Sequence, residues 1–525
     1  MLEIPEQMNA AEYFVDRHIR EGRGESTAVI DAADGRRYSY SDVTAMVNRF
    51  GNALTETLEV RMEERVMLIL LDSPAFVAGF FGSIKAGAVP VPTNTLLEPE
   101  EYAYLLNDSR ARVLVISAPL LPQITPVLEI LHYLRRLVVV GDAEFESLPN
   151  YLKLHDYDAL LGDASDQLEA VPRHKDDACF WLYSSGTTGF PKGAVHLQHD
   201  MIFCSETYAR QTLKITENDR MFSVAKLFFA YGLGNGLYFP FSVGATTILN
   251  PGRPEPESIF QVIDAHKPTL FFSVPTSYSA LLHVEDATAR FDVSSIRLCV
   301  SAGEALPPSI YHRWKEKFDV DILDGIGSTE ALHIFISNQP GAIKPGSSGR
   351  LVPGYEAKIV DEDGREVPVG EVGDLLISGD STCAYYWNRH EESKERILGR
   401  WLHTGDKYLL DKEGFFHYQG RSDDMLKVSG MWASPIEIEN SLLEHGAIRE
   451  CGVIGDEDEA GLVKPKAFVA LNPGFAASDQ LTEELIAFVK SKISRFKYPR
   501  WIVYVDDLPK TATGKIQRFK LREMS

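Results

Sequence analysis

Short apolar runs rich in β-branched residues alternate along most of the chain with longer segments whose apolar residues recur at helical spacing. The apolar runs include residues 65–71, 112–117, 269–275 and 296–303. The helical segments include residues 40–58, 256–266 and 308–318. Strands that alternate with helices are typical of proteins in which helices cover a largely parallel sheet. We therefore predict an α/β fold for the larger part of the chain.

The pattern of apolar and polar residues changes near residue 420. The polar, turn-like segment GRSDDMLK (420–427) is followed by alternating helical and strand-like segments, namely 435–445, 451–455, 466–471, 479–493 and 501–506. About one hundred residues of this kind form a separate α+β domain of ordinary size. We predict a large N-terminal domain, residues 1–422, and a small C-terminal domain, residues 423–525. Residues 422–424 are either a hinge between the two or a simple surface turn.

The charge of the chain is strongly acidic, with 53 lysines and arginines against 75 aspartates and glutamates and a formal net charge of −22. This balance argues against a general affinity for nucleic acids or anionic membranes. Residues 490–525 nevertheless hold ten basic and three acidic residues. A basic end on an acidic body could attract a polyanion such as ATP or coenzyme A, or it could be a solvated tail.

The cysteines and the N-terminus bear on the compartment. The five cysteines lie far apart and form no CxxC pattern, so we expect no disulfide framework or zinc cluster and a reducing compartment. The N-terminus lacks the basic start and apolar core of a secretory signal. The apolar stretch 76–84 is broken by glycine and ends at Lys85, so it cannot span a bilayer. We expect a cytoplasmic protein, monomeric or homodimeric, with no nucleic-acid or membrane partner.

The most informative local pattern is YSSGTTGFPKG at residues 183–193. It follows a strand-like run, ACFWL, and precedes a segment that we interpret as helical. Glycines let a backbone approach a ligand closely, while hydroxyls, N–H groups and one lysine can surround a phosphate. The pattern is not a Walker A loop, because Pro191 stands where the second glycine is required. It predicts a phosphate-binding loop of another kind.

Together with five further segments, this loop resembles the adenylate-forming superfamily of acyl- and aryl-CoA synthetases, amino-acid adenylation domains and beetle luciferases. The segments stand in the family's order: SAGEAL (301–306), DGIGSTE (324–330), HTGD (403–406) with GR (420–421), SDDMLKVSG (422–430) and PKTATGKIQR (509–518). By resemblance they bind adenine, contact the α-phosphate and magnesium, bind the ribose, form the hinge and CoA tunnel, and supply the catalytic lysine. The resemblance covers nearly the whole chain and implies that the small domain is mobile.

The resemblance implies an acid–CoA ligase that uses ATP, Mg²⁺ and coenzyme A. A carboxylate would attack the α-phosphate of ATP to form an acyl-adenylate, and coenzyme A would then take the acyl group. Because an anion must attack a polyanion, catalysis depends mainly on positioning and electrostatic stabilisation. No nucleophilic cysteine is needed, since the thiol comes from coenzyme A.

The resemblance assigns charge-handling roles to particular residues. Lys515 would bridge the attacking carboxylate and the α-phosphate, and Lys192 would meet the departing pyrophosphate. Glu330 would hold Mg²⁺, which takes oxygen ligands, although a glutamate at a helix start is the alternative interpretation. Hydroxyls for the phosphate oxygens would come from Thr329, Ser184, Ser185, Thr187 and Thr188.

The resemblance also places the nucleotide and the thiol. The residues expected around adenine and the α-phosphate are Gly303, Glu304, Ala305, Asp324, Gly325 and Ile326. Asp406 would accept hydrogen bonds from the ribose hydroxyls, and Arg421 would donate to them. One lysine cannot serve both steps from one position, so the small domain would swing about Asp423. That swing would bring Lys427 and Gly430 to the coenzyme A path.

The acid pocket of the family is drawn from residues 228–234 and from the segment after Glu330. The first segment has no aspartate to hold a substrate amine, so an amino acid is not expected. A flat, partly aromatic slot suits an aromatic ring, and the segments FFAYGLGNG and STEALHIF resemble those of benzoate–CoA ligases. We therefore predict benzoate or a close analogue. The expected pocket residues are Ala230, Tyr231, Gly232, Gly327, His333 and Ile334, although Tyr231 and His333 could instead be core residues.

Other interpretations remain open. The enzyme could ligate another small aryl or acyl acid, such as a hydroxybenzoate or an aminobenzoate, or it could load a separate carrier protein. A luciferase-like oxygenase shares the motifs. A non-catalytic nucleotide-binding protein would have lost a charged residue of the site. The charged residues expected to act in catalysis are all present, namely Lys192, Glu330, Asp406, Arg421 and Lys515. His196 and His199 have metal-like spacing but no third ligand nearby, so we interpret both as part of a helix start.

Overall fold

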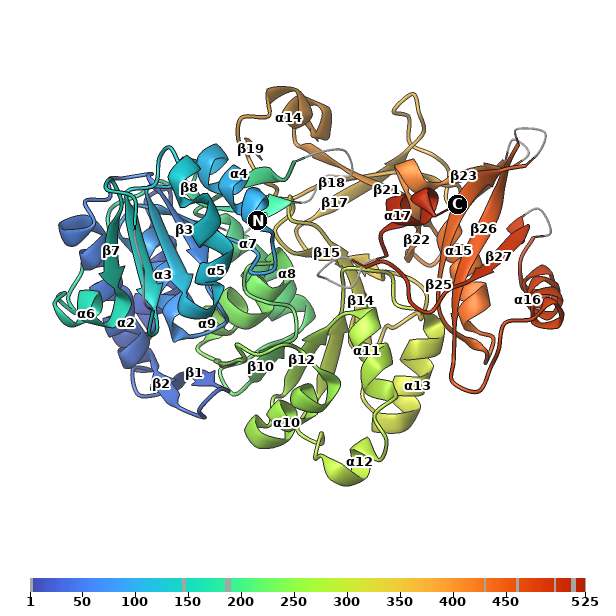
Figure 1. Cartoon of the computed structure of the whole chain (residues 1–525), viewed down its shortest axis with the longest axis horizontal. Coiled ribbons are helices and arrows are strands. Elements are labelled where there is room, and N and C mark those ends of the chain that lie inside the picture. The colour runs from blue at the N-terminus through green and yellow to red at the C-terminus, as the bar shows by residue number, and fades with distance from the viewer. Residues whose placement is uncertain are drawn as a thin grey trace.

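The computed structural model describes residues 3–143, 148–184, 190–428, 431–458, 462–494, 497–510 and 516–524. Within these residues helices and sheets are mixed throughout, as the sequence predicts for an α/β fold (Figure 1). The ribbon coloured orange to red, at the right of Figure 1, forms a smaller body after residue 425.

The largest sheet of the described residues has nine strands. In spatial order they are β16 (Arg350–Leu351), β15 (Ile334–Ser337), β14 (Ile322–Gly327), β13 (Leu298–Ser301), β12 (Leu270–Ser273), β10 (Arg220–Ser223), β11 (Thr246–Leu249), β1 (Thr27–Asp31) and β2 (Arg37–Ser39). Neighbouring strands from β14 to β1 are parallel, and β2, β15 and β16 extend the two edges antiparallel. The apolar runs 269–275 and 296–303 form β12 and β13, which confirms them as parallel strands.

A second sheet is parallel throughout, and it contains the other two predicted strands. Its spatial order is β4 (Val89–Pro92), β3 (Arg65–Ile69), β5 (Val113–Ser117), β6 (Arg136–Val140) and β7 (Lys153–Asp156). Two antiparallel sheets complete the large part of the chain. One contains β8 (Ala178–Ser184), β9 (Lys192–Leu197) and β19 (Tyr385–Tyr386); the other contains β17 (Glu356–Val360), β18 (Gly373–Ser378), β20 (Ile397–Leu398), β21 (Trp401–Leu410) and β22 (Phe416–Arg421).

The helices of the large part fall into two runs along the chain. The first run is α1 (Arg17–Arg20), α2 (Tyr40–Asn52), α3 (Pro74–Lys85), α4 (Pro99–Ser109), α5 (Leu121–Ile124), α6 (Tyr157–Gly162) and α7 (Asp200–Cys204). The second run is α8 (Ala230–Leu233), α9 (Phe239–Val243), α10 (Pro256–His266), α11 (Pro275–Leu282), α12 (Ala287–Arg290), α13 (Pro308–Phe318) and α14 (His390–Arg396).

Local sequence signals explain where the predicted helices begin and end. Pro256 and Pro308 occupy the first position of α10 and α13, where the missing N–H of proline removes no helical hydrogen bond. Both helices match the predicted ranges. The helix predicted at 40–58 begins at α2, where Ser39 and Asp42 form a capping box. The apolar stretch 76–84 lies in α3, which is buried on every side. No helix in the described ranges is both long enough and apolar enough to cross a bilayer.

One secondary-structure prediction near the phosphate motif is wrong. Residues 192–197 form strand β9, which pairs antiparallel with β8, so the motif joins two strands of a hairpin and does not lead into a helix. His196 therefore lies in a strand and is not part of a helix start. His199 is the residue that precedes α7, as expected of a helix start. Pairing with β8 decides the structure here, because sheet context readily overrides weak helical propensity.

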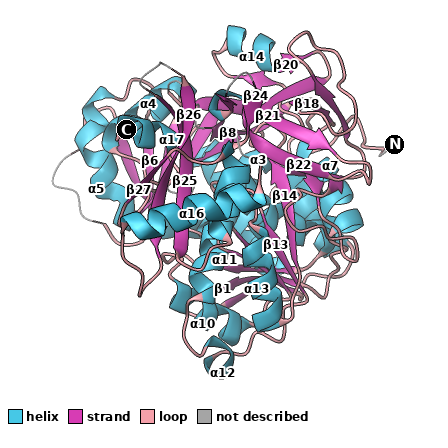
Figure 2. Cartoon of the chain, turned by 90° about the vertical axis from the view of Figure 1, so that its right-hand side faces the viewer, coloured by secondary structure: helices cyan, strands magenta, loops and turns pink. Residues whose placement is uncertain are grey.

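The smaller body contains every element predicted after residue 430. Its elements are β23 (Leu426–Val428), β24 (Met431–Ala433), α15 (Pro435–Leu443), β25 (Ile448–Glu457), β26 (Val463–Leu471), α16 (Asp479–Lys492), β27 (Trp501–Tyr504) and α17 (Arg518–Glu523). Figure 2 shows α16 lying across the β25–β26–β27 sheet. The body has a hydrophobic core of its own around Ile438, Val453 and Leu485, whereas the main core ends near Phe416.

Candidate functional site

The carboxyl ends of the central parallel strands bring the two expected adenine segments together. Ser273, Ser301 and Asp324 stand opposite one another in turn on β12, β13 and β14. Residues 301–306 and 324–330 therefore leave the sheet side by side. Ligands of open α/β sheets bind outside the carboxyl ends of the strands. This edge of the sheet is the candidate nucleotide site.

Asp324 connects these two segments. Its Oδ2 accepts a hydrogen bond from the backbone N–H of Leu306 at 3.2 Å. Burial raises the pKa of the Asp324 carboxyl well above its usual range. Gly303 adopts a φ of +94°, which side-chain-bearing residues rarely adopt, so this turn requires glycine. The neighbouring residues Glu304 and Ala305 are half-buried, as is Ile326.

The expected ribose residues form an ion pair across two neighbouring strands. Asp406 on β21 stands opposite Arg421 on β22, and Arg421 Nη1 donates to Asp406 Oδ1 at 3.1 Å. The same Nη1 lies 3.2 Å from the Thr404 carbonyl oxygen. Burial alone would lower the pKa of Arg421, but the Asp406 carboxylate holds it above its usual value. The carboxylate and the guanidinium are thus fixed next to each other, one as acceptor and one as donor.

Glu330 lies near the loop end of the β8–β9 hairpin, next to β19. Its Oε1 accepts hydrogen bonds from the Ser184 hydroxyl at 3.1 Å and from the Tyr386 hydroxyl at 2.9 Å. Burial, and then the Glu330 carboxylate, raise the pKa of Tyr386 well above its usual value, so this hydroxyl stays a donor. Residues 328–333 form turns and no helix, so the helix-start interpretation of Glu330 is wrong.

The donor set around Glu330 fits a cation that keeps most of its ligands from water and phosphate. No group of three or more His, Cys, Asp or Glu side chains in the described residues could hold a metal by itself. Among those residues, the hydrogen bonds to the Glu330 carboxylate fall on Oε1, which leaves Oε2 for another partner. Mg²⁺ is usually bound by one or two carboxylates together with substrate phosphates. A single carboxylate at this place is consistent with that pattern.

The ends of the phosphate motif are fixed to each other. Ser184 and Lys192 are paired on β8 and β9, and the Lys192 ammonium lies 5.8 Å from the centre of the Tyr386 ring. The intervening residues 185–189 lie outside the described residues. They include three expected phosphate ligands, Ser185, Thr187 and Thr188.

Helix α4 contacts the chain on both sides of the loop of this hairpin, which sequence reasoning missed. The Tyr183 hydroxyl donates to Asp108 Oδ2 at 2.7 Å. The Tyr104 hydroxyl donates to the Pro191 carbonyl at 3.1 Å, and the Tyr104 ring stacks on Phe190 with centroids 4.6 Å apart. These contacts join residues about 75 to 87 positions apart in the chain, so no local motif could have revealed them.

The expected acid-pocket residues converge on His333. Its Nε2 lies 3.3 Å from the Tyr231 carbonyl oxygen and 3.2 Å from Asn235 Oδ1, so Nε2 carries the hydrogen. Burial lowers the pKa of His333 to about 3, which leaves the imidazole neutral at pH 7. The Tyr231 hydroxyl lies 3.1 Å from the Val300 carbonyl oxygen and 3.3 Å from that of Ser273. Both side chains are thus anchored by the surrounding core.

The glycines of this region are explained by close backbone contacts. A Cβ at Gly232 would lie 2.0 Å from the Lys226 carbonyl oxygen, and one at Gly327 would lie 2.5 Å from that of His333. A Cβ at Gly325 would lie 2.9 Å from a carbonyl oxygen of β15. Gly325 and Gly327 therefore permit β14 and β15 to approach, so their smallness is required by the sheet itself. The other two pocket residues, Ala230 and Ile334, are buried.

The expected catalytic lysine, Lys515, lies outside the described residues, as does Gly430. The chain on both sides of residues 511–515 is held together: Lys510 and Ile516 form an antiparallel bridge, and the Gln517 N–H donates to the Pro509 carbonyl at 2.8 Å. Just beyond, the half-buried Arg518 donates to the Glu439 carboxylate at 2.7 Å. The described residues on either side of 511–515 are thus anchored to the smaller body. Lys427 lies on β23 of that body.

The residues on either side of Asp423 are bonded to different parts of the chain. The Ser422 hydroxyl donates to Asp374 Oδ1 on β18 at 2.7 Å. On the other side, Arg522 of α17 donates to Asp424 Oδ1. Asp423 itself lies between them in a single 3₁₀ turn, Ser422–Asp424. Backbone rotation at this turn would therefore move one part of the chain relative to the other.

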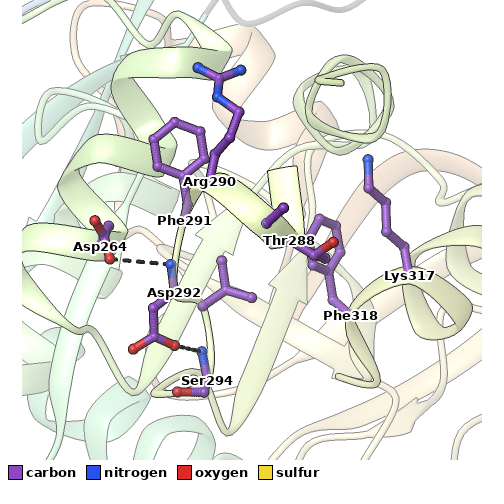
Figure 3. A pocket seen from close by; sticks show the side chains of 10 residues that line it. Asp264, Thr288, Arg290, Phe291, Asp292, Ser294, Lys317 and Phe318 are labelled. Atoms are coloured by element: carbon purple, nitrogen blue, oxygen red, sulfur yellow. Dashed lines mark hydrogen bonds between the residues drawn. The ribbon is translucent and has the colours of Figure 1, made fainter. Parts of the chain in front are cut away.

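A hollow of about 520 Å³ lies apart from these residues. It is formed by α10, α12 and α13 and the loop that follows α12, and Asp264, Arg290, Phe291 and Lys317 are among its lining residues (Figure 3). It shares no residue with the candidate site. We do not assign it a role in the chemistry.

Two family models match this chain in the order in which its parts occur. A model of AMP-binding enzymes matches residues 15–387, and a model of the AMP-binding enzyme C-terminal domain matches residues 437–515. The chain therefore belongs to the AMP-binding enzyme family.

Within that family, close relatives act on aromatic acids by their names. A benzoate–CoA ligase of Thauera aromatica is 50% identical over 522 residues, which are 99% of this chain and 97% of that protein. A solved benzoate CoA ligase from Burkholderia xenovorans LB400 matches with a TM-score of 0.89 and 46% identity, over 98% of this chain and 100% of its own. A solved anthranilate CoA ligase in complex with anthranoyl-AMP matches with a TM-score of 0.94 and 44% identity, over 99% and 98%.

Proposed function

We propose that this protein ligates benzoate, or a close analogue, to coenzyme A at the expense of ATP, through an acyl-adenylate and with release of AMP and pyrophosphate. Its family and its full-length similarity to benzoate–CoA ligases support an AMP-forming acid–thiol ligase. The observation that carries the proposal is the meeting of Ser184, Glu330 and Tyr386 at the phosphate hairpin, beside the strand ends that hold the adenine segments.

In the first step the substrate carboxylate attacks the α-phosphorus of ATP, and pyrophosphate leaves. Asp406 and Arg421 bind the ribose hydroxyls, and residues 301–306 and 324–327 line the adenine. Glu330 would hold Mg²⁺, which would neutralise phosphate charge when bound. Lys192 accompanies the departing pyrophosphate, and Lys515 stabilises the negative charge shared by the carboxylate and the α-phosphate.

In the second step the thiol of coenzyme A attacks the acyl carbonyl, and AMP leaves. We propose that residues 1–422 and 423–525 are two domains and that Asp423 is the hinge between them. The bonds of Ser422 to one part and of Asp424 to the other support this position. Rotation there withdraws Lys515 and presents Lys427 and Gly430 to the pantetheine arm. Rotation at one residue thus gives each of the two reactions its own set of surrounding side chains.

The acid pocket suits a neutral aromatic ring. His333 is a neutral donor held by Tyr231 and Asn235, and four aromatic rings surround it, those of Tyr208, Tyr231, Tyr238 and Phe239. No acidic side chain stands in residues 228–234 to bind a substrate amine. Rings with small substituents remain candidates, in keeping with the relative named for anthranilate.

The proposal is tested by a pyrophosphate-release screen with ATP and Mg²⁺ against benzoate, hydroxybenzoates, aminobenzoates, cinnamate and short fatty acids. We expect release that depends on the acid and is fastest with benzoate or a small substituted benzoate. AMP release should in addition depend on coenzyme A, which distinguishes a ligase from an enzyme that loads a carrier protein. Release without any added acid, or faster release with fatty acids, would contradict the proposal.

A further inference from the structure

His196 is a fully buried histidine that none of the roles above uses. It lies on β9, four residues after Lys192, and has no solvent-exposed surface. Its Nδ1 lies 2.7 Å from Asp200 Oδ2, and its Nε2 lies 2.8 Å from the carbonyl oxygen of Thr329. The imidazole thus connects the strand of the phosphate hairpin with the segment that carries Glu330.

The chemistry of the two contacts fixes the direction of one hydrogen bond. A carbonyl oxygen can only accept, so the hydrogen on Nε2 points at Thr329 whichever partner holds the proton between Nδ1 and Asp200. Asp200 is itself fixed, because its Oδ2 also accepts the Leu197 backbone N–H at 3.1 Å. Asp200, His196 and Thr329 are therefore joined in series, and the hydrogen bond between the last two runs from His196 to Thr329. All three residues are buried or half-buried.

This support acts on the peptide bond that precedes Glu330. The Thr329 carbonyl belongs to that peptide, and the Glu330 carbonyl on the other side accepts the Cys383 N–H at 2.6 Å. Glu330 is thus held through both neighbouring peptides as well as through its carboxylate. The peptide held by His196 sets the direction in which the Glu330 side chain leaves the backbone.

We propose that His196, oriented by Asp200, is a positioning residue that aims Thr329 and Glu330 at the phosphates of ATP and at Mg²⁺. The inference rests on the proposed function, since it assumes that Glu330 serves the nucleotide. It excludes a metal role for His196 itself, because both ring nitrogens already face oxygen acceptors. Groups that orient a metal ligand typically change metal affinity or activity about 10–100-fold when they are removed.

The experiment compares His196→Phe with His18→Phe. The phenylalanine at 196 keeps the ring that stacks on Phe180 but removes the N–H that holds Thr329. His18 is a matched control: it is fully buried, its Nε2 lies 2.7 Å from the Phe241 carbonyl oxygen, and its Nδ1 accepts from Arg23. Both changes remove a buried histidine from a backbone carbonyl, but only one of them concerns Glu330.

Three quantities are measured: the melting temperature, the binding of α,β-methylene ATP by calorimetry as Mg²⁺ is varied, and the two half-reactions. We expect His196→Phe to raise the Mg²⁺ concentration for half-maximal nucleotide binding about tenfold. Pyrophosphate exchange should fall to match, while thioester formation from supplied benzoyl-adenylate should stay within about twofold of the wild type. His18→Phe should lower only the melting temperature.

If His196→Phe does not fold, His196→Gln and Asp200→Asn decide the matter. The glutamine amide can still donate to Thr329, so His196→Gln should keep a Mg²⁺ dependence closer to the wild type than that of Asp200→Asn. A neutral amide oxygen at 200 that accepts the Leu197 N–H favours the histidine hydrogen on Nδ1, which takes it away from Thr329. A wild-type Mg²⁺ dependence in Asp200→Asn, or an equal loss of both half-reactions in His196→Phe, would overturn the inference. Absence of acid-dependent pyrophosphate exchange in the wild type would instead overturn the proposed function, and the calorimetry would still test the inference.

Discussion

The two lysines expected to act on the phosphates, Lys192 and Lys515, belong to different parts of the chain. Lys192 lies on β9, which is paired on both sides, by β8 and by β19, within the large part of the chain. Lys515 lies outside the described residues, but the residues on either side of 511–515 are anchored to the smaller body, where Lys510 pairs with Glu450 and Arg518 with Glu439. One lysine thus lies in the large part of the chain, and the residues that flank the other belong to the smaller body.

The difference indicates how one protein can catalyse two reactions at one place. Asp406 and Arg421, which we propose to serve both steps, are fixed to each other across paired strands. The part needed in only one step is joined to them through the turn at 422–424. Changes to Asp406 or Arg421 should therefore affect both half-reactions, whereas changes to Lys515 or Asp423 should separate them.

The largest effect is expected for Lys515→Ala. Loss of one charge-stabilising donor typically lowers a rate about 10²–10³-fold, so benzoate-dependent pyrophosphate exchange should almost disappear. Thioester formation from supplied benzoyl-adenylate should stay near the wild type, because that step does not use this lysine. Lys510→Ala is the control, since it removes a basic residue of the same body that pairs with Glu450. An equal loss of both half-reactions in Lys515→Ala would contradict the assignment.

The large part of the chain can be tested through the pH dependence of its free energy of unfolding. Burial raises the pKa of Asp72 to about 6, against the opposing effect of Lys226, whereas the unfolded value is about 3.9. Between these values the folded state binds the extra proton, so the free energy of unfolding falls as pH rises from about 4 to 6. The fall amounts to at most about 3 kcal/mol.

Asp72→Asn keeps an oxygen acceptor for the Leu227 N–H but cannot titrate. Chemical unfolding of both proteins at several pH values should show that the variant lacks this part of the fall. Identical slopes for the two proteins between pH 4 and 6 would show that Asp72 does not titrate in this way. The result would sharpen the comparison, because Asp72 supports the segment that leads into the acid pocket.

Asp423→Pro tests the connection between the two bodies. Proline fixes φ near −65°, so the turn can no longer rotate freely. We expect thioester formation to fall roughly tenfold more than pyrophosphate exchange, because only the second step requires the rotation. Asp423→Ala removes the same side chain and leaves the backbone free, so it should behave nearly as the wild type. Unchanged coenzyme A transfer in Asp423→Pro would place the hinge elsewhere.

The smallest effect is expected for Tyr104→Phe. The change keeps the ring that stacks on Phe190 and removes the hydroxyl that donates to the Pro191 carbonyl and accepts from Arg389. A neutral hydrogen bond contributes about 0.5–1.5 kcal/mol, so the KM for ATP should rise about 2–10-fold. Tyr151→Phe removes a similar hydroxyl-to-carbonyl bond on Leu128, away from the site, and should leave this KM unchanged. Equal KM values in the two variants would deny α4 a role in holding the hairpin.

The sequence predicted most elements because their signals are local. The helices at 256–266 and 308–318 carry a proline at the first position and one apolar face, and both ends match. The strands at 269–275 and 296–303 are continuous apolar runs, as fully buried parallel strands require. The two-body division follows from the polar segment between two separate apolar cores.

Features that depend on distant residues could not be predicted in the same way. Strand β9 was interpreted as helical, because its pairing with β8 is not visible in its own residues. The Tyr386 hydroxyl reaches Glu330 across 56 positions, and His196 reaches Thr329 across 133. Neither contact leaves a local pattern. Motifs predict the expected site residues, whereas the residues that position them come close only in the folded chain.

The central claim is tested most directly by a crystal structure with α,β-methylene ATP, Mg²⁺ and benzoate. The account predicts the triphosphate between residues 183–193 and 324–330, the ribose hydroxyls within hydrogen-bonding distance of Asp406, and the ring of benzoate next to His333. A nucleotide bound anywhere else on the molecule, including the hollow formed by α10, α12 and α13, would contradict it.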